Sequence, residues 1–258
     1  VEKLKSRGKV VLDPAEGQLA SFHTGEGRLP KTKDIINSIR SLFEASLPLR
    51  GKKVLVTAGP TRESIDPVRF ISNRSSGKMG YALAENARDM GASVMLVSGP
   101  IALADISEIK TVKVETAVEM KNAVIRNCAK ADYIFMAAAV ADYMPAEQLM
   151  KKMKRTTTKI NIDLIPAPDI LKSLQGKTKA VITAFALETH NGKKEAMRKM
   201  KEKNAHFIVL NYANEKNAGF DSSTNSVTIF SENGHQIELK KDRKDRVAKK
   251  IIQYILIN

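Results

Sequence analysis

The sequence predicts an α/β protein with a doubly wound, mostly parallel sheet that ends in a C-terminal β-hairpin and helix. Three patterns support this: short, continuous apolar runs, helical periodicity between them, and a turn dipeptide between the last two runs. Apolar runs without alternation are typical of strands that are buried on both faces of a parallel sheet, with crossover helices connecting them.

The predicted parallel strands are five apolar runs in the middle of the chain. They are residues 54–58, 93–97, 133–140, 180–185 and 207–210. Ligands bind such a sheet at the carboxyl ends of its strands, near the point where the strand order reverses.

Two amphipathic helices fit between these strands. The first begins near Lys78 and ends at Gly91, which can terminate a helix in a left-handed conformation. The second follows Thr116, whose spacing to Glu119 is that of a capping box. The inward face of this helix includes Cys128, which we therefore expect in the core rather than at a reactive site.

The end of the chain predicts a hairpin and a helix. Residues 227–230 and 236–239 flank an Asn-Gly dipeptide at 233–234, although the loop could exceed two residues. Residues 240–250 are expected to form the solvated start of the closing helix. Its inward residues are expected to be Val247, Ile251 and Ile255.

Residues 1–48 do not show this alternation of strands and helices. A possible strand at 10–12 is followed by a glycine-rich stretch and a helix at about 32–45. We interpret residues 1–48 as a tail or linker without a core, and residues 49–258 as the main domain.

Composition limits the class of protein. The 258 residues are 43% hydrophobic and 28% charged, which is typical of a globular chain rather than a disordered one. No apolar run approaches the roughly 20 residues that a membrane span needs, and no signal-peptide pattern is present. The single cysteine excludes an internal disulfide, a Cys-based zinc site and an iron–sulfur cluster. These features favour a cytoplasmic location.

The charge suggests an anionic partner. Lysine and arginine number 43 against 28 acidic residues, for a net charge of +15. A phosphorylated small molecule, nucleic acid or anionic lipid would fit this excess, and a solvated basic surface is the alternative.

Two segments could bind anions at predicted strand ends. Gly59 follows the first strand, but the dinucleotide fingerprint is absent there, and a simple turn is the alternative. Residues 66–80 place hydroxyls, an amide and glycines before a helix start, where backbone N–H groups favour phosphate or carboxylate. An ordinary N-cap loop is the competing interpretation.

Further candidates follow the later strands. The small residues 137–141 would admit a ligand ring, and Asp142 could bind a sugar or Mg²⁺, or cap a helix. The basic loop 151–155 and the pair Lys199 and Lys203, on one helix face, could surround a triphosphate. Two solvated surfaces are the alternative.

Together these segments resemble the bacterial phosphopantothenoylcysteine synthetases. Residues 66–80 resemble the motif D-P-V-R-x-I-S-N-x-S-S-G-K-M-G, and residues 137–143 resemble the A-A-V-A-D-Y block. Residues 152–155, 168–171 and 185–189 resemble the basic K-I-K-K, P-D-I-L and F-A-L-E-T motifs, in the family's order. The resemblance extends from Gly51 to the C-terminus.

The resemblance implies a Rossmann-like fold and a ligase. CTP would activate the carboxylate of 4′-phosphopantothenate as an acyl-cytidylate, and L-cysteine would displace CMP, with Mg²⁺ as cofactor. It implies catalytic roles for Asn73 at the acyl group and for Lys152 at the phosphates. The expected nucleotide-binding residues are Ala137, Ala138, Asp142, Lys152, Pro168, Asp169, Ile170, Leu171, Phe185, Lys199 and Lys203. The expected substrate- or anion-binding residues are Gly59, Arg69, Asn73, Ser75, Ser76, Gly77 and Lys78.

The tail resembles a different domain. Residues 19–21 and 25–29 resemble the end of the flavin-dependent phosphopantothenoylcysteine decarboxylase, but Ser21 stands where that family has cysteine. We therefore expect no FMN in this chain. In the synthetase part, Ala167 replaces the asparagine that commonly precedes the P-D-I-L motif.

The expected partners are the small-molecule substrates, without nucleic acid or membrane. The family resemblance also implies a homodimer with each substrate pocket near the partner subunit, and a larger oligomer where a decarboxylase domain is fused. The alternative function is a non-catalytic, nucleotide-binding Rossmann-like module, and a hydride-transfer enzyme is disfavoured by the missing glycine fingerprint.

Overall fold

The computed structural model describes residues 1–258 except 20, 156, 158, 189–191 and 213–221. The described chain forms two compact units, residues 1–50 and residues 51–258. Within the described residues, no helix is long and apolar enough to cross a membrane.

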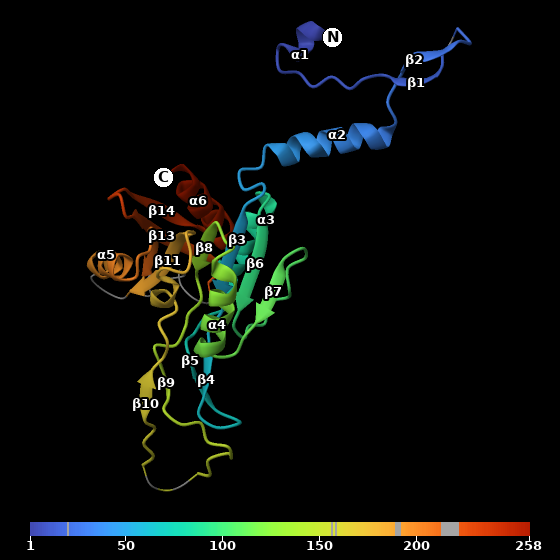
Figure 1. Ribbon diagram of the computed structural model, residues 1–258. Coiled ribbons are helices and arrows are strands. Elements are labelled where there is room, and N and C mark those ends of the chain that lie inside the picture. The colour runs from blue at the N-terminus through green and yellow to red at the C-terminus, as the bar shows by residue number, and fades with distance from the viewer. Residues whose placement is uncertain (20, 156, 158, 189–191, 213–221) are drawn as a thin grey trace. The chain divides into compact units, whose positions relative to one another are not determined.

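The larger unit is built on an eight-stranded sheet, which confirms the predicted fold class (Figure 1). In sheet order its strands are β14 (Gln236–Arg243), β13 (Thr224–Ser231), β12 (Phe207–Tyr212), β11 (Val181–Glu188), β8 (Tyr133–Met136), β3 (Lys53–Ala58), β6 (Ser93–Ser98) and β7 (Lys110–Lys113). The strands from β12 to β7 are parallel, and β13 and β14 are antiparallel. Numbered along the chain, the parallel strands have the order 3-2-1-4-5-6 of a Rossmann sheet, which reverses between β3 and β8.

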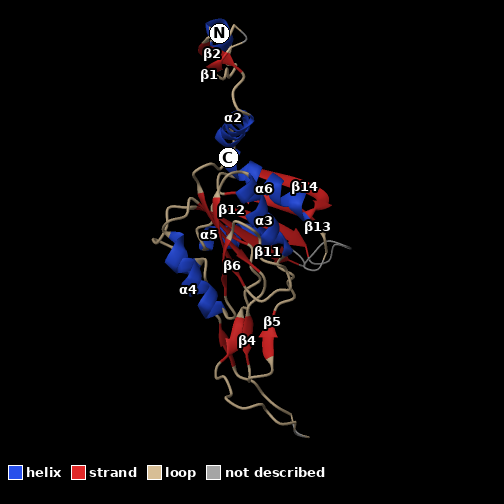
Figure 2. Ribbon diagram, turned by 90° about the vertical axis from the view of Figure 1, so that its right-hand side faces the viewer, coloured by secondary structure: helices blue, strands red, loops and turns tan. Residues whose placement is uncertain are grey.

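Helices cover both faces of this sheet, as a parallel sheet requires (Figure 2). The helices α3 (Lys78–Asp89) and α6 (Lys244–Ile257) pack together on one face. The core on the other face combines α4 (Ala117–Cys128), α5 (Gly192–Glu202) and the short 3₁₀-helix η1 (Lys172–Leu174).

Local signals in the sequence explain several helix ends. The hydroxyl of Thr116 accepts the N–H of Glu119 at 3.2 Å, which confirms the predicted cap. The Glu119 carboxylate accepts the N–H of Glu115 at 2.7 Å instead of the N–H of the capping residue. Cys128 is 1% exposed, which confirms its place in the core, and burial raises the pKa of its thiol.

Two predicted boundaries are wrong. The third strand stops at Met136 rather than at residue 140, because the N–H groups of Ala138 and Ala141 bond to threonine hydroxyls instead of a neighbouring strand. Residues 240–243 belong to β14, so the closing helix begins at Lys244, which is only 7% exposed rather than solvated.

The last hairpin and helix otherwise match expectation. The strands β13 and β14 flank a loop at residues 232–235, longer than the two-residue turn, and Gly234 has a φ of 84°. The inward residues of α6 are buried as predicted, namely Val247, Ile251 and Ile255.

Two small antiparallel pairs extend from the carboxyl edge of the sheet (Figure 1). One pairs β4 (Arg62–Ser64) with β5 (Phe70–Ser72), and the other pairs β9 (Tyr143–Pro145) with β10 (Leu164–Pro166). We call residues 143–166 the arm. No sequence pattern predicted these strands, because each has only three residues.

The smaller unit contains α1 (Glu2–Lys5), β1 (Ala15–Gln18), β2 (Thr24–Arg28) and α2 (Thr32–Ala45). The strands β1 and β2 form an antiparallel pair, and the predicted strand at 10–12 is absent. The helix at 32–45 is confirmed. Among residues 1–48 whose burial is described, none is buried, which agrees with a segment that has no core.

Candidate functional site

A cavity of about 520 Å³ lies at the carboxyl edge of the sheet, around the point where the strand order reverses. It joins the ends of β8, β11 and β12 to the start of α3. The predicted residues that line it are Asn73, Ser75, Ser76, Gly77, Lys78, Ala137, Ala138, Asp142, Pro168, Asp169, Ile170, Leu171, Phe185, Lys199 and Lys203. The structure therefore brings together motifs that are up to 130 residues apart in the chain.

One end of the cavity is formed by the start of α3. Gly77 is the N-cap residue, with a φ of 73°, and makes no side-chain cap. A Cβ at this position would lie 2.9 Å from Ile101 Cδ1, so both backbone conformation and space favour glycine. The helix can therefore present its first N–H groups and its positive dipole end to an anionic ligand.

The loop 137–141 is held by two buried threonines. Thr57 Oγ1 accepts the N–H of Ala138 at 3.1 Å, and Thr61 Oγ1 accepts the N–H of Ala141 at 3.0 Å. Both threonines are fully buried. Because Thr57 lies near the end of β3, Thr61 follows that strand and the loop follows β8, these bonds fix the loop at the reversal point of the sheet.

Asn73 is fixed to the same loop. Its side-chain NH₂ donates to Val140 O at 2.9 Å and to Ala139 O at 3.3 Å. Both of its N–H bonds are thus directed at backbone carbonyls, so the residue shapes the cavity wall in addition to any contact with a ligand.

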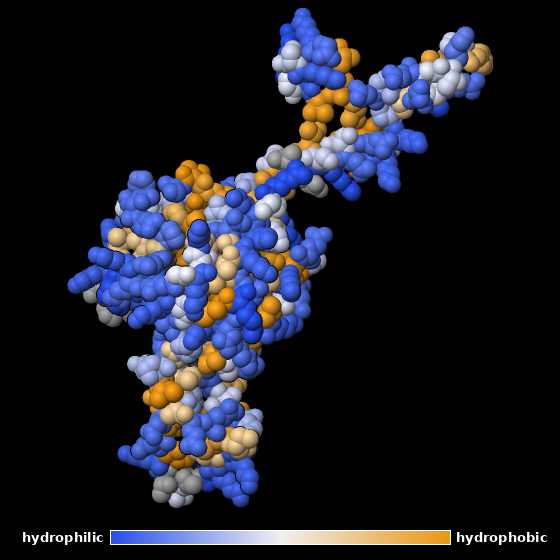
Figure 3. All heavy atoms as spheres, viewed as in Figure 1, coloured by the Kyte–Doolittle hydropathy of each residue, from blue (hydrophilic) through white to orange (hydrophobic). Residues whose placement is uncertain are grey.

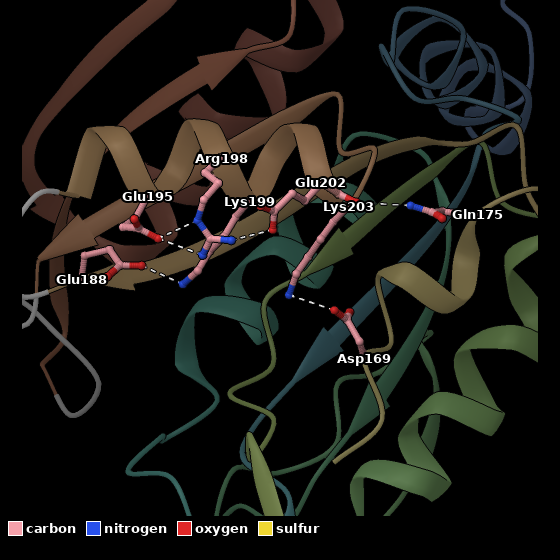
Figure 4. A network of polar contacts seen from close by, with 8 residues as sticks. All are labelled: Asp169, Gln175, Glu188, Glu195, Arg198, Lys199, Glu202 and Lys203. Atoms are coloured by element: carbon pink, nitrogen blue, oxygen red, sulfur yellow. Dashed lines mark hydrogen bonds and ion pairs between the residues drawn. The ribbon is translucent and has the colours of Figure 1, made fainter. Parts of the chain in front are cut away.

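Two predicted lysines, one on α5 and one directly after it, are each paired with a carboxylate (Figure 4). Lys199 Nζ lies 2.7 Å from Glu188 Oε1, and Lys203 Nζ lies 3.3 Å from Asp169 Oδ2. Arg198, which directly precedes Lys199 in sequence, instead pairs with two glutamates of its own helix, as Figure 4 shows. The cavity therefore receives two oriented ammonium groups, and an anion that binds there must compete with their carboxylates.

Asp142 is exposed at the cavity wall and caps no helix, since β9 follows it directly. Its carboxylate has no hydrogen-bond or ion-pair partner among the residues that the structure describes. Those residues include no group of three or more His, Cys, Asp or Glu that could hold a metal ion. Mg²⁺ commonly binds one or two carboxylates together with substrate phosphates, so Asp142 fits such an ion only with a ligand present.

Three predicted residues do not line the cavity. Gly59 is a tight turn, with a φ of 75°, whose carbonyl accepts the N–H of Ala139 at 2.9 Å. Arg69 contacts Asp66 and the carbonyl of Met153. Lys152 is exposed on the arm. Their predicted binding roles stay predictions.

Sequence reasoning missed polar residues at the end of the cavity nearest β13. Asn211, Asn225 and Lys244 line it, and Asn211 Nδ2 donates to Asn225 Oδ1 at 3.2 Å. Asn225 is 4% exposed and Lys244 is 7% exposed. No local signal identifies them, because their burial depends on β13 running antiparallel, which places its first residues at this edge.

Comparisons with known proteins found similar sequences over almost the whole chain. The family model described as DNA/pantothenate metabolism flavoprotein C-terminal domain matches residues 49–257. The coenzyme A biosynthesis bifunctional protein CoaBC of Bacillus subtilis (strain 168) is 40% identical over 259 residues, which is 99% of this chain and 64% of that protein. A protein named cysteine/cysteine sulfinic acid decarboxylase, from an unknown prokaryotic organism, is 42% identical over 98% of this chain and 72% of its own length.

A solved structure has the same fold. The crystal structure of the C-terminal domain of a coenzyme A biosynthesis bifunctional protein CoaBC superimposes with a TM-score of 0.71 and 43% identity. The match covers 82% of this chain and 97% of that one. This chain spans between 60% and 65% of the length of the CoaBC proteins that it matches.

Proposed function

The chain belongs to the family of DNA/pantothenate metabolism flavoprotein C-terminal domains, and from this premise we propose that it is the ligase that joins 4′-phosphopantothenate to L-cysteine in coenzyme A biosynthesis, with CTP as the activating nucleotide. The observation that carries the proposal is that a helix start, a loop of small residues and two lysines line one and the same cavity. A binding site for two anionic substrates also accounts for the charge of +15.

The proposed chemistry has two steps. A carboxylate oxygen of phosphopantothenate attacks the α-phosphorus of CTP, the bond to the β-phosphate breaks, and pyrophosphate leaves. The amine of cysteine then attacks the acyl carbon, CMP leaves with the bonding electrons, and the amine loses a proton. Both steps need alignment of two bound substrates and stabilisation of developing negative charge.

The cavity residues have distinct roles in this proposal. The small loop residues 137–141 admit the cytosine nucleotide next to the backbone, and residues 168–171 form the opposite wall. Lys199 and Lys203 bind the triphosphate, and Asn73 contacts the acyl group. The start of α3 binds an anionic group of either substrate.

Asp142 is the proposed contact of Mg²⁺ with the protein. When bound, the ion neutralises phosphate charge and orients the triphosphate. The carboxylate fits this role because it faces the cavity without a competing partner among the described residues.

We further propose a homodimer that forms through the arm. Arm residues with exposed apolar side chains include Tyr143 (55%), Met150 (88%) and Ile160 (48%), and Figure 3 shows apolar atoms in this region. Such concentrations of exposed apolar side chains are typical of interaction sites. A second copy would cover them and bring its own Lys152 near a cavity. Sedimentation of the parent chain and of Met150→Lys tests this, and a monomeric parent would contradict it.

Residues 1–48 are proposed as the end of a decarboxylase domain rather than part of the ligase. The support is their separation from the larger unit and the start of the family match at residue 49.

Pyrophosphate release tests the proposed ligase. It should require CTP, phosphopantothenate and Mg²⁺ together, and the amide product should form only after cysteine is added. Nucleotide binding without pyrophosphate release would instead support the non-catalytic module. Release of CO₂ from cysteine or cysteine sulfinic acid would support the activity named for the 42% identical relative.

A further inference from the structure

The carboxylate of Asp66 is the most deeply buried charge near the arm. Asp66 is 2% exposed, and its side chain is fully covered. Its Oδ1 accepts the N–H of Val68 at 2.8 Å and of Arg69 at 2.9 Å, which closes its own turn. Its Oδ2 accepts the N–H of Met153 at 3.1 Å, from a segment 87 residues away in the chain.

The carbonyl group of Met153 also forms a hydrogen bond to this turn. Arg69 Nη2 donates to the carbonyl of Met153, and Arg69 Nε lies 3.6 Å from Asp66 Oδ2. A further backbone bond joins the same two segments, since Leu149 N–H donates to Ile65 O at 2.9 Å. The turn 65–69 therefore fixes the backbone of the basic loop at Met153 and the backbone just before the loop at Leu149.

Asp66 remains charged in this position. Burial alone would raise the pKa of its carboxyl group. The N–H donors of Val68, Met153 and Arg69, together with the Arg69 guanidinium, outweigh burial and hold the pKa below its ordinary value. A permanently ionised acceptor makes stronger hydrogen bonds than a neutral one.

We propose that Asp66 is a positioning residue, which acts through Met153 to fix the basic loop and thereby the ammonium of Lys152. Lys152 directly precedes the held peptide, is exposed, and has a flexible side chain. If its backbone were free, an ammonium on a mobile loop would reach the phosphates only occasionally. The inference rests on the proposed function for its catalytic consequence, but not for the anchoring itself.

The competing explanation is that Asp66 only closes its own turn. Asp66→Asn separates the two, because the amide oxygen can still accept from Val68 and Arg69. Its NH₂ group, however, would point at the N–H of Met153, and two donors cannot form a hydrogen bond with each other. The substitution therefore removes the link to the arm and keeps the turn.

The kinetic test is a double-mutant cycle with Lys152→Gln. We expect Asp66→Asn to lower kcat by about tenfold, and the double variant to be no slower than Lys152→Gln alone. The matched control is Glu63→Gln, which changes another buried carboxylate, 3% exposed, that accepts the N–H of Ala117 at the start of α4 rather than an N–H of the basic loop. Any loss in Glu63→Gln should multiply with that of Lys152→Gln. Multiplying losses in the Asp66 cycle would overturn the proposal.

Limited trypsin digestion tests the anchoring without any activity. The basic loop contains four cleavage sites, at Lys151, Lys152, Lys154 and Arg155. Asp66→Asn should speed cleavage there by about tenfold or more under conditions where Glu63→Gln does not. Unchanged cleavage would refute the anchoring, whereas a parent chain that releases no pyrophosphate would refute only the proposed function.

A second variant covers the case in which Asp66→Asn fails to fold. Arg69→Gln removes the bond to the Met153 carbonyl from a side chain that is 43% exposed, so folding should tolerate it. Arg69→Gln should also speed cleavage of the loop, but by less than Asp66→Asn does. Equal cleavage in Arg69→Gln and the parent would overturn the proposal.

Discussion

The cavity and the arm are held in place by different kinds of contact. The cavity lies where secondary structure forces strand ends together, and its loop 137–141 is bonded to threonines of the adjacent strand end. The arm has strands of only three residues, and its basic loop is connected to the larger unit through Asp66, Arg69 and one backbone bond. A binding site can thus combine a rigid part with a part whose position depends on a few side chains.

The largest expected effect is on the arm. Lys152→Gln should lower turnover by about a hundredfold or more, because the variant loses a cation that stabilises the developing phosphate charge. The melting temperature should stay nearly unchanged, since Lys152 is exposed. Lys151→Gln, with the same exposure and the same loop, is the control and should keep most of the activity. Equal losses in both variants would indicate only a general charge effect.

A substitution at Asn73 tests the cavity, which is the rigid part of the site. Its NH₂ donates to Ala139 O and Val140 O, so Asn73→Asp places a carboxylate against two carbonyl oxygens. We expect a rate loss of about a hundredfold at saturating CTP, because the new carboxylate adds negative charge beside the acyl group, where negative charge develops in the reaction. Steady-state kinetics on the folded variant measures this. A higher KM for CTP with unchanged kcat would instead assign Asn73 only to shaping the loop.

Lys199 on α5 and Lys203 directly after it should have smaller effects, and mainly on binding. Lys199→Ala and Lys203→Ala should each raise the KM for CTP by about tenfold, with a smaller change in kcat. Higher salt should reduce the difference from the parent. The control is Arg198→Ala on the same helix, because its guanidinium is paired with Glu195 and Glu202 rather than directed at the cavity. A similar KM increase in the control would contradict the assignment.

The ionisation of Asp66 should also make the free energy of unfolding depend on pH in the acidic range. The pKa of Asp66 is lower in the folded chain than in the unfolded one, where the pKa of aspartate is about 3.9. Its contribution to the free energy of unfolding is therefore fully present above that pH and is lost as the pH falls through the folded value. Asp66→Asn should remove this part of the pH dependence. Urea denaturation between neutral and strongly acidic pH measures it, and identical slopes in parent and variant would contradict it.

The cavity and the sheet that carries it were largely predictable from the sequence. Apolar runs without alternation identified five of the six parallel strands described in the sheet and missed the edge strand β7, and the carboxyl-end rule placed the later motifs in one cavity. The strand end at Met136 was not predictable. Residues 137–140 are as apolar as a strand, and only the hydroxyls of Thr57 and Thr61 divert their backbone from the sheet.

Long-range contacts account for most of the remaining misses. The bond from Met153 to Asp66 joins segments 87 residues apart, and no local pattern encodes it. Lys244 has the composition of a solvated helix start, yet it is buried because β14 continues to Arg243 and places the helix start at the cavity. The predicted strand at 10–12 had no partner segment with which to pair.

The smallest effect is expected from removing the tail. Deletion of residues 1–45 retains Leu49, which is 1% exposed, and removes a segment in which no residue of described burial is buried. Truncation that exposes no core should change neither the melting temperature nor kcat by more than about twofold. The match to an isolated C-terminal domain, covering 97% of that structure's chain, supports independent folding. A large loss of ligase activity on deletion would assign the tail a part in the reaction. Flavin bound to the purified full chain, or CO₂ release from phosphopantothenoylcysteine, would show instead that the tail retains decarboxylase function despite Ser21.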